Sequence, residues 1–489
     1  MQKFRKRFIS ILLILVALYL LLFIPDSDKH NIVKAVDKPF VWNQDSVWNA
    51  LENKFKETKD KSKSSLDSGI QLLFAKENNL HNYMQGNKLG AADSSLQLIL
   101  NNYFHLAALV AAQPQQRDSF IQIYNQFRNA VKLQSQQWNM NDKAVRNSLY
   151  QMLYGMRAAA EEVLLQTDSI PFNPAMNVKD EPSATPSTSI FGIEVHSGDL
   201  LVSRGGAEVS AMISRGNNYP GNFSHVALIY VEEKTNQPYL VEAHIEKGVA
   251  VASAEQYIKD KKLRFMVLRP RADLPQLKSD PMLPHKAAKL AYEEALSRHI
   301  PYDFKMNFYD SSALFCSEVG SYAYKKKGIQ LWQAVSTISS QGVVNWLSDF
   351  GVENFVTQMP SDLEYDPQLS VVAEWRGPET LMKDHIDNAV MDALLEQADK
   401  EKKITYAHWQ LPFVRIVKLW CIIKNKFGGV GIIPEGMSAT QALKNQTFVA
   451  LYNDVRTETQ VLSDQFIKAH QYKPPYWQLV AMARSAAKK

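Results

Sequence analysis

The spacing of apolar residues divides the chain into segments of helical and of strand-like periodicity. Between residues 66 and 163 four stretches carry apolar side chains at helical spacing, one of which contains Phe120, Ile123, Tyr124, Phe127 and Val131. The stripes are narrow and lie on Gln- and Asn-rich segments. Residues 30–65, ahead of them, are polar and Lys-rich, which is typical of a partly ordered spacer. We therefore expect residues 30–170 to form a helical bundle or a coiled-coil-like region.

Strand-like periodicity begins after a linker at residues 171–190, which is rich in Pro, Ser and Thr. A helix is then predicted over residues 285–298. Strands followed by helices indicate an α+β domain at residues 191–360. The strands are expected where short β-branched or apolar runs occur, at residues 199–203, 226–231, 239–243, 248–252 and 265–269.

Residues 361–489 return to helical periodicity. One segment, residues 411–427, mixes Ile, Val and Trp with four basic residues. It fits a core helix with a solvated basic edge, or a helix lying in a membrane interface. We favour the core helix here, because burial of apolar residues inside the protein is the simpler explanation of the pattern.

The N-terminus carries a second kind of apolar segment. Residues 8–24 are apolar apart from Ser10, and basic residues precede them. As a helix the run is about 25 Å long, at the short end for crossing a hydrocarbon core of roughly 30 Å. The residues that follow it make a poor cleavage site, which favours an uncleaved signal anchor over a signal peptide. We expect residues 1–29 to be a cytoplasmic basic flank and a single transmembrane helix, which places the main body outside the cytoplasm, and in the periplasm if the source is bacterial.

Composition excludes several classes of function. The chain has 489 residues and a net charge of +5, which is mild for this length, and it lacks the basic stripe with interleaved aromatics typical of a nucleic-acid partner. Two cysteines exclude a disulfide scaffold and a cysteine-cluster metal site, although one bond between Cys316 and Cys421 is compatible with the count. No phosphate-binding, dinucleotide-binding or zinc motif occurs, so we expect no cofactor and no metal.

Cys316 is the first candidate for chemistry. It follows Asp310, Ser311 and Ser312, which are preferred residue types at a helix N-cap, and helical spacing continues after it. In the first turn of a helix the macrodipole and the free N–H groups favour the nucleophilic thiolate. The alternative is that Cys316 is a small buried apolar residue, as single cysteines often are.

Four motifs in order resemble a known family. They are SGDLLV at residues 197–202, SHVALIY at 224–230, YLVEA at 239–243, and PYD at 301–303 followed by FCSE at 315–318. They resemble the strands and the nucleophile region of NlpC-type cysteine hydrolases. The cysteine follows the histidine here, as in the permuted papain-like branch similar to YiiX and YebB. The resemblance covers about residues 191–330.

The resemblance implies a papain-like α+β fold and a catalytic triad. Cys316 would attack a carbonyl carbon, and its backbone N–H would stabilise the oxyanion. His225 would take the proton of the thiol and later deliver it to the leaving group. Glu242 would orient the imidazole and stabilise its charged form.

Further residues have weaker assignments from the same resemblance. Tyr302 would add a phenolic donor to the oxyanion and substrate site, and Asp199 would support it by holding a turn beside it. His244 competes with Glu242 for the third role, because both share one face of a strand. Glu318 is expected to be a solvated helix residue. The insert at residues 205–223 is long enough to shape a substrate cleft.

Together these features predict a membrane-anchored, extracytoplasmic cysteine hydrolase of amide or ester bonds. Its substrate would be a cell-wall peptide or a lipid acyl group, and the sequence leaves both open. One alternative is a catalytically degenerate domain that binds a protein or cell-envelope partner, displayed by the helical regions. Another is a structural anchor in which Cys316 is bonded to Cys421.

The topology can be tested with a reporter fused to the C-terminus. Because the basic flank is expected to remain in the cytoplasm, a reporter that needs an extracytoplasmic location should be active and a cytoplasmic reporter inactive. Activity of the cytoplasmic reporter, or release of a soluble mature form, would contradict the anchor.

Overall fold

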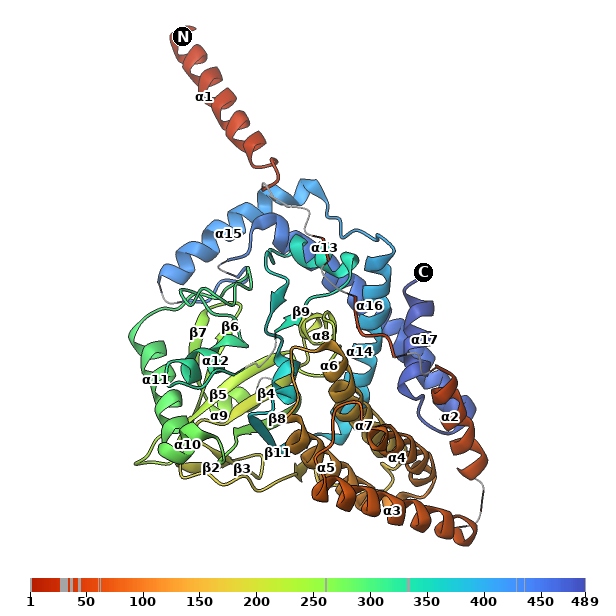
Figure 1. The fold of residues 1–489 in the computed structure, drawn as a ribbon. Coiled ribbons are helices and arrows are strands. Elements are labelled where there is room, and N and C mark those ends of the chain that lie inside the picture. Colours follow the sequence, from red (N-terminus) through yellow and green to blue (C-terminus); the bar gives the residue numbers. More distant parts are fainter. Residues whose placement is uncertain are drawn as a thin grey trace.

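The structure is a computed structural model of the chain (Figure 1). It describes residues 2–26, 34–35, 38–42, 45–59, 61, 63–259, 262–331, 335–427, 429–434 and 436–488.

A seven-stranded antiparallel sheet lies at the centre of the α+β domain, in the order β1-β11-β8-β4-β5-β6-β7. The expected strands are present within a few residues of their predicted ends. Two strands lie outside the expected limits of the domain, because β1 falls in the predicted linker and β11 lies beyond residue 360. The bounds are β1 (Ala175–Asn177), β4 (Leu200–Gly205), β5 (His225–Val231), β6 (Pro238–His244), β7 (Gly248–Ser253), β8 (Lys262–Pro270) and β11 (Leu369–Arg376).

Both faces of the sheet are covered, so its strands are apolar on both sides. On one face, strand residues such as Val202 and Leu228 pack against Ala287 of α11 (Leu283–Ser297) and Val319 of α12 (Glu318–Lys325). On the other face, residues such as Leu201 pack against the hairpin of β2 (Ser187–Ile190) and β3 (Ile193–His196). The smaller helices around the sheet are α8 (Glu208–Arg215), α9 (Ala254–Lys259), α10 (Pro275–Ser279) and α13 (Gln341–Asp349).

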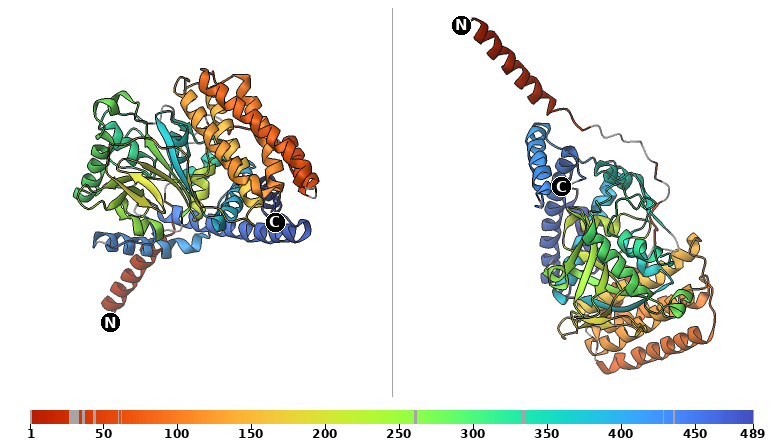
Figure 2. Two further views of the ribbon diagram at one scale, coloured as in Figure 1. Left: turned by 90° about the horizontal axis from the view of Figure 1, so that it is seen from below. Right: turned by 90° about the vertical axis from the view of Figure 1, so that its left-hand side faces the viewer.

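The N-terminal helical region packs beside this sheet (Figures 1 and 2). Helices occur where the apolar stripes predicted them, and one π-helical turn interrupts the last. The residues predicted as a spacer contain one more helix, α2, whose Trp48 stacks on Trp477 near the C-terminus. The bounds are α2 (Asp45–Lys59), α3 (Lys63–Gly86), α4 (Ser94–Ala112), α5 (Arg117–Ser135), α6 (Lys143–Tyr150), the π turn Gln151–Gly155 and α7 (Met156–Gln166).

The C-terminal helices are α14 (Pro378–Asp399), α15 (Leu411–Lys426), α16 (Ala439–His470) and α17 (Tyr476–Ala486). α14, α16 and α17 share one apolar core with α13. α15 does not behave as the core helix that the sequence favoured, because only one of its sides packs against the protein. An apolar pattern shows which faces are hydrophobic, and tertiary contacts decide which of them is buried.

The N-terminal helix α1 (Gln2–Leu21) projects from the body (Figure 1). Its apolar part, Ile9–Leu21, is exposed and is shorter than a full membrane span. Among the described residues, the one helix that is long and apolar enough to cross a membrane is α4 (Ser94–Ala112). α4 lies inside the chain and is packed in the core of the helical region, so the helix that meets this test is internal, and the N-terminal membrane span stays a prediction.

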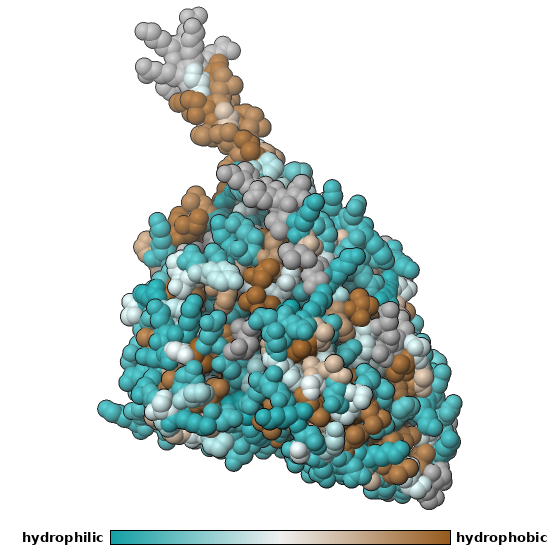
Figure 3. All heavy atoms as spheres, viewed as in Figure 1, coloured by the Kyte–Doolittle hydropathy of each residue, from teal (hydrophilic) through white to brown (hydrophobic). Residues whose placement is uncertain are grey.

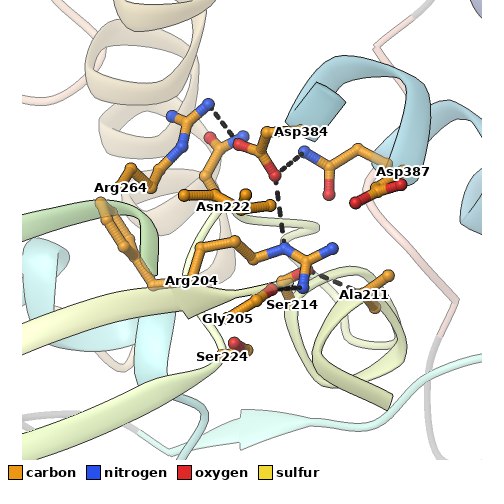
Figure 4. Close-up of polar contacts among 12 residues, drawn as sticks. Arg204, Gly205, Ala211, Ser214, Asn222, Ser224, Arg264, Asp384 and Asp387 are labelled. Atoms are coloured by element: carbon orange, nitrogen blue, oxygen red, sulfur yellow. Dashed lines mark hydrogen bonds and ion pairs between the residues drawn. The ribbon is translucent and has the colours of Figure 1, made fainter. Parts of the chain in front are cut away.

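Buried ion pairs join the three parts of the molecule. Asp384 of α14 forms ion pairs with Arg204 of β4 at 3.3 Å and with Arg264 of β8 at 2.5 Å (Figure 4). Glu161 of α7 pairs with Arg264 at 2.5 Å and with Arg376 of β11 at 3.1 Å. Burial raises the pKa of Glu161, but the two arginines hold it well below its usual range. Each part of the chain thus places a charge that another part neutralises.

Removing one member of this network should destabilise the whole chain. In Asp384→Ala the guanidinium groups of Arg204 and Arg264 stay buried with one partner fewer, and the free energy of unfolding should fall by about 3–5 kcal/mol. Denaturant unfolding of the full chain measures it. The control is Glu353→Ala, which removes the exposed ion pair with Lys305 and should cost about 0–1 kcal/mol. Equal effects of the two substitutions would contradict a structural role for the network.

Candidate active site

The candidate site lies at the edge of the sheet where β4 ends, β5 begins and β6 ends. In antiparallel pairing these three ends meet: Ser203 pairs with His225, and Ala227 pairs with Glu242. A cavity of about 1090 Å³ opens there and is lined by His225, Cys316 and Tyr302, among others. The sheet therefore brings residues that are distant in the sequence to one edge.

Glu242 is held between two imidazoles. Its Oε2 lies 2.6 Å from Nε2 of His225, and its Oε1 lies 2.9 Å from Nε2 of His244. Burial raises the pKa of Glu242, but the hydrogen bonds from the two histidines lower it far more, so the carboxylate is charged. The sequence offered Glu242 and His244 as alternatives for the third role of the triad, whereas in the structure the two side chains contact each other.

Cys316 lies in the turn directly before α12, one residue ahead of the N-cap Ser317. It is two residues short of the helix, where the sequence expected the first turn. Its Sγ lies 3.8 Å from the carbonyl oxygen of Ser224 and 4.0 Å from Oγ of Ser317. Within the described part of the chain, the backbone N–H of Cys316 makes no hydrogen bond.

Glu318 fixes this turn. Its Oε2 accepts a hydrogen bond from the N–H of Phe315 at 3.0 Å, and its side chain is buried. Burial raises the pKa of Glu318 to about 9, so the carboxyl is protonated at neutral pH. The expectation of a solvated helix residue is wrong, because the first turn of α12 packs into the body instead of facing solvent. Gly320 permits this packing, since a Cβ there would lie 2.4 Å from Leu200.

His225 makes contacts on both sides. Burial lowers its pKa, but hydrogen bonds to Cys316 and Glu242 raise the value to about 9. Because Nε2 faces Glu242, Nδ1 is the nitrogen left for the sulfur. The imidazole is therefore protonated at neutral pH and placed between a carboxylate and the thiol, the arrangement in which a thiolate is stabilised.

The two supporting residues have different positions. Tyr302 lines the cavity beside Cys316, and its backbone forms a β-bridge with Leu314. Asp199 lies at the opposite end of β4, outside this cavity, where it pairs with Arg269 through two contacts of 2.8 Å and accepts from the N–H of His196 at 2.7 Å. Asp199 holds a turn, as expected, but that turn is not beside Cys316 and supports no oxyanion or substrate there.

Two walls of the cavity come from regions far from Cys316 in the sequence. Residues 205–213 form one wall, in agreement with the role expected for the insert. The C-terminal helical region supplies the other wall, which the sequence did not reveal, because nothing local connects these residues to Cys316. The residues of this second wall are Thr380, Lys383, Ile432, Pro434, Met437, Asn445 and Arg456.

The remaining chemistry of the site is simple. Within the described residues, no group of three or more His, Cys, Asp or Glu side chains is arranged to hold a metal ion. Cys316 and Cys421 are both free thiols. The alternative of a bond between them is wrong. Cys421, which lies on α15, packs against Ile433 and Met437 and not against Cys316.

An antiparallel sheet that carries the histidine and the carboxylate, followed later in the chain by a cysteine at the start of a helix, defines a papain-like thiol amidase domain in permuted order. Residues 194–373 match the family described as the permuted papain-like amidase enzyme, YaeF/YiiX, C92 family, so this part of the chain is a domain of that family. The matched residues include Cys316, His225 and Glu242. Neither the curated proteins nor the solved structures contain a match to the chain.

The reactivity of Cys316 follows from its neighbours. At about pH 7, below the pKa of about 9 of His225, Cys316 should be alkylated much faster than Cys421, which has no imidazole beside it. His225→Ala should abolish the difference. His244→Ala is the matched control. It should preserve the difference in alkylation rate, because the partner of His244 is Glu242 and not the thiol. Mass spectrometry of the folded protein after a thiol-reactive probe measures both sites, and an inert Cys316 would contradict the arrangement.

Proposed function

We propose that the chain is a membrane-anchored cysteine hydrolase that cleaves amide or ester bonds through Cys316, His225 and Glu242. The observation that carries the proposal is the position of His225, with Nε2 2.6 Å from Glu242 and its other side on Cys316. The family of the domain supports an amidase reaction. A domain that had lost catalysis and only bound a partner would have no need to keep this charged arrangement buried.

The reaction has two stages. Sγ of Cys316 attacks the carbonyl carbon, and the C–N or C–O bond breaks as His225 gives its proton to the leaving amine or alcohol. A water molecule, whose proton goes to His225, then hydrolyses the thioester and releases the acid. Glu242 keeps the imidazole oriented and stabilises its charge. The free N–H of Cys316 and the hydroxyl of Tyr302 are the donors proposed for the oxyanion.

We propose that α1 anchors the enzyme in a membrane, with the main body outside the cytoplasm. The exposed apolar stretch from Ile9 to Leu21 and the basic residues ahead of it support this location. The bond cleaved belongs to a cell-wall peptide or to an acylated lipid. The mixed lining of the cavity, with Lys383 and Arg456 beside Met437 and Phe350, accommodates an acyl or peptidyl chain that carries negative charge.

Substitutions of the triad test the chemistry. Cys316→Ala should fold normally and lose all hydrolysis of acyl esters and amides, and Cys316→Ser should lose nearly all of it. Glu242→Gln should lower turnover by about 10²-fold or more, because a neutral amide does not stabilise the imidazolium. His244→Ala should have a much smaller effect. Turnover that survives in Cys316→Ala would favour the binding function, and a larger effect of His244→Ala would mean that His244 orients His225.

A further inference from the structure

α15 carries apolar side chains on a buried side and on an exposed side. The inner side, with Val414, Val417 and Cys421, packs against the loop and helix that follow. The outer side has no partner in the part of the chain that the structure describes. Its stripe repeats every three or four residues, which is the period of one helix face, and the five side chains are between 48% and 87% exposed: Phe413, Ile416, Trp420, Ile423 and Phe427.

The exposed stripe continues beyond the helix. Trp409 precedes it at 64% exposure, and Val430 and Ile432 follow it in the loop to α16. In Figure 3 a hydrophobic patch lies beside the base of α1, over the position of α15 in Figure 1. A continuous exposed apolar surface of this length marks a site of interaction.

Charge identifies the kind of partner. α15 contains no acidic residue, and its basic residues flank the stripe: Arg415, Lys418, Lys424 and Lys426. The ammonium group of Lys424 lies 5.0 Å from the ring of Trp420. A helix with aromatic and aliphatic residues on one face and Lys or Arg at its borders matches the interface of a bilayer with anionic headgroups.

The end of α1 is fixed beside this surface. Arg415 donates to the carbonyl oxygen of Leu21 at 3.1 Å and pairs with Asp26 at 2.8 Å. Asp26 also accepts from the N–H and the hydroxyl of Thr440 at the start of α16, each at 3.1 Å. Figure 2 shows α1 leaving the body on the side where α15 lies. If α1 enters the membrane, α15 lies at the surface of that membrane.

We infer that α15, together with Phe427, Val430 and Ile432, forms a docking surface that lies in the interface of an anionic lipid bilayer. Ile432 is 77% exposed and also lines the cavity of Cys316, so the mouth of the cavity opens at this surface. Resting on the proposed function, a second consequence follows: the substrate is an amphiphile held in the bilayer, and its scissile carbonyl reaches Cys316 without leaving the interface.

A depth measurement on the full chain tests the docking surface. In a Cys316→Ala, Cys421→Ala background, single cysteines placed by Ile416→Cys, Ile423→Cys and Leu296→Cys carry an environment-sensitive fluorophore. Leu296 on α11 is a matched control, because it is an exposed aliphatic residue outside the patch. In vesicles of brominated phosphatidylcholine and phosphatidylglycerol, the labels at 416 and 423 should be quenched several-fold more than the label at 296, with a blue-shifted emission.

The outcomes separate the two inferences. Equal quenching at the three sites would overturn the docking surface. This outcome is also expected if a protein partner, and not a bilayer, covers α15. Equal quenching at 416 with and without phosphatidylglycerol would overturn the part assigned to the basic residues. With Cys316 restored, Ile416→Glu combined with Ile423→Glu should lower hydrolysis of a vesicle-held acyl substrate and leave the alkylation rate of Cys316 unchanged. Hydrolysis that is absent in the parent protein would refute the proposed function, whereas the quenching result would still stand.

Discussion

The buried charges between α7, the sheet and α14 are the constraint on which the rest of the structure depends. A guanidinium or carboxylate out of water is costly unless a partner neutralises it. Arg264 meets both Glu161 and Asp384, so one strand residue needs a helix from each of the two helical regions. The helical regions are therefore part of the same folded unit as the amidase domain. The second wall of the cavity exists because this contact places the C-terminal helices over the site.

The electrostatics of the active site are built in the opposite way. The network around Asp384 pairs buried arginines only with carboxylates, whereas His225 is shared between the carboxylate of Glu242 and the thiol of Cys316. Glu242 is in turn shared with His244, so its second oxygen is occupied and its position is fixed. The carboxyl of Glu318 contributes no negative charge at neutral pH, which leaves the imidazole as the main charge facing the thiol. Proton transfer requires an imidazole that is shared between a carboxylate and a thiol in this way.

Much of the fold was predictable because its signals are local. The strands from β4 to β8 are β-branched runs between turns, and the motif residues His225, Glu242 and Cys316 lie within or beside them. β11 has a strand-like sequence, but it lies beyond residue 360, where the sequence analysis placed the end of the domain. The burial of Glu318, the distant position of Asp199 and the cavity wall at Ile432 and Arg456 depend on tertiary contacts. No pattern within a few residues records which face of α15 is buried.

The order of the elements along the chain has a consequence for synthesis. His225 and Glu242 leave the ribosome first, Cys316 follows, and the residues that close the cavity, up to Arg456, come near the end. Asp384, the partner of Arg204 and Arg264, also comes late. A partly synthesised chain holds Cys316 without the residues that close its cavity, and Arg204 and Arg264 without Asp384. The cavity and the neutralised ion-pair network are thus completed together, in the last stage of making the protein.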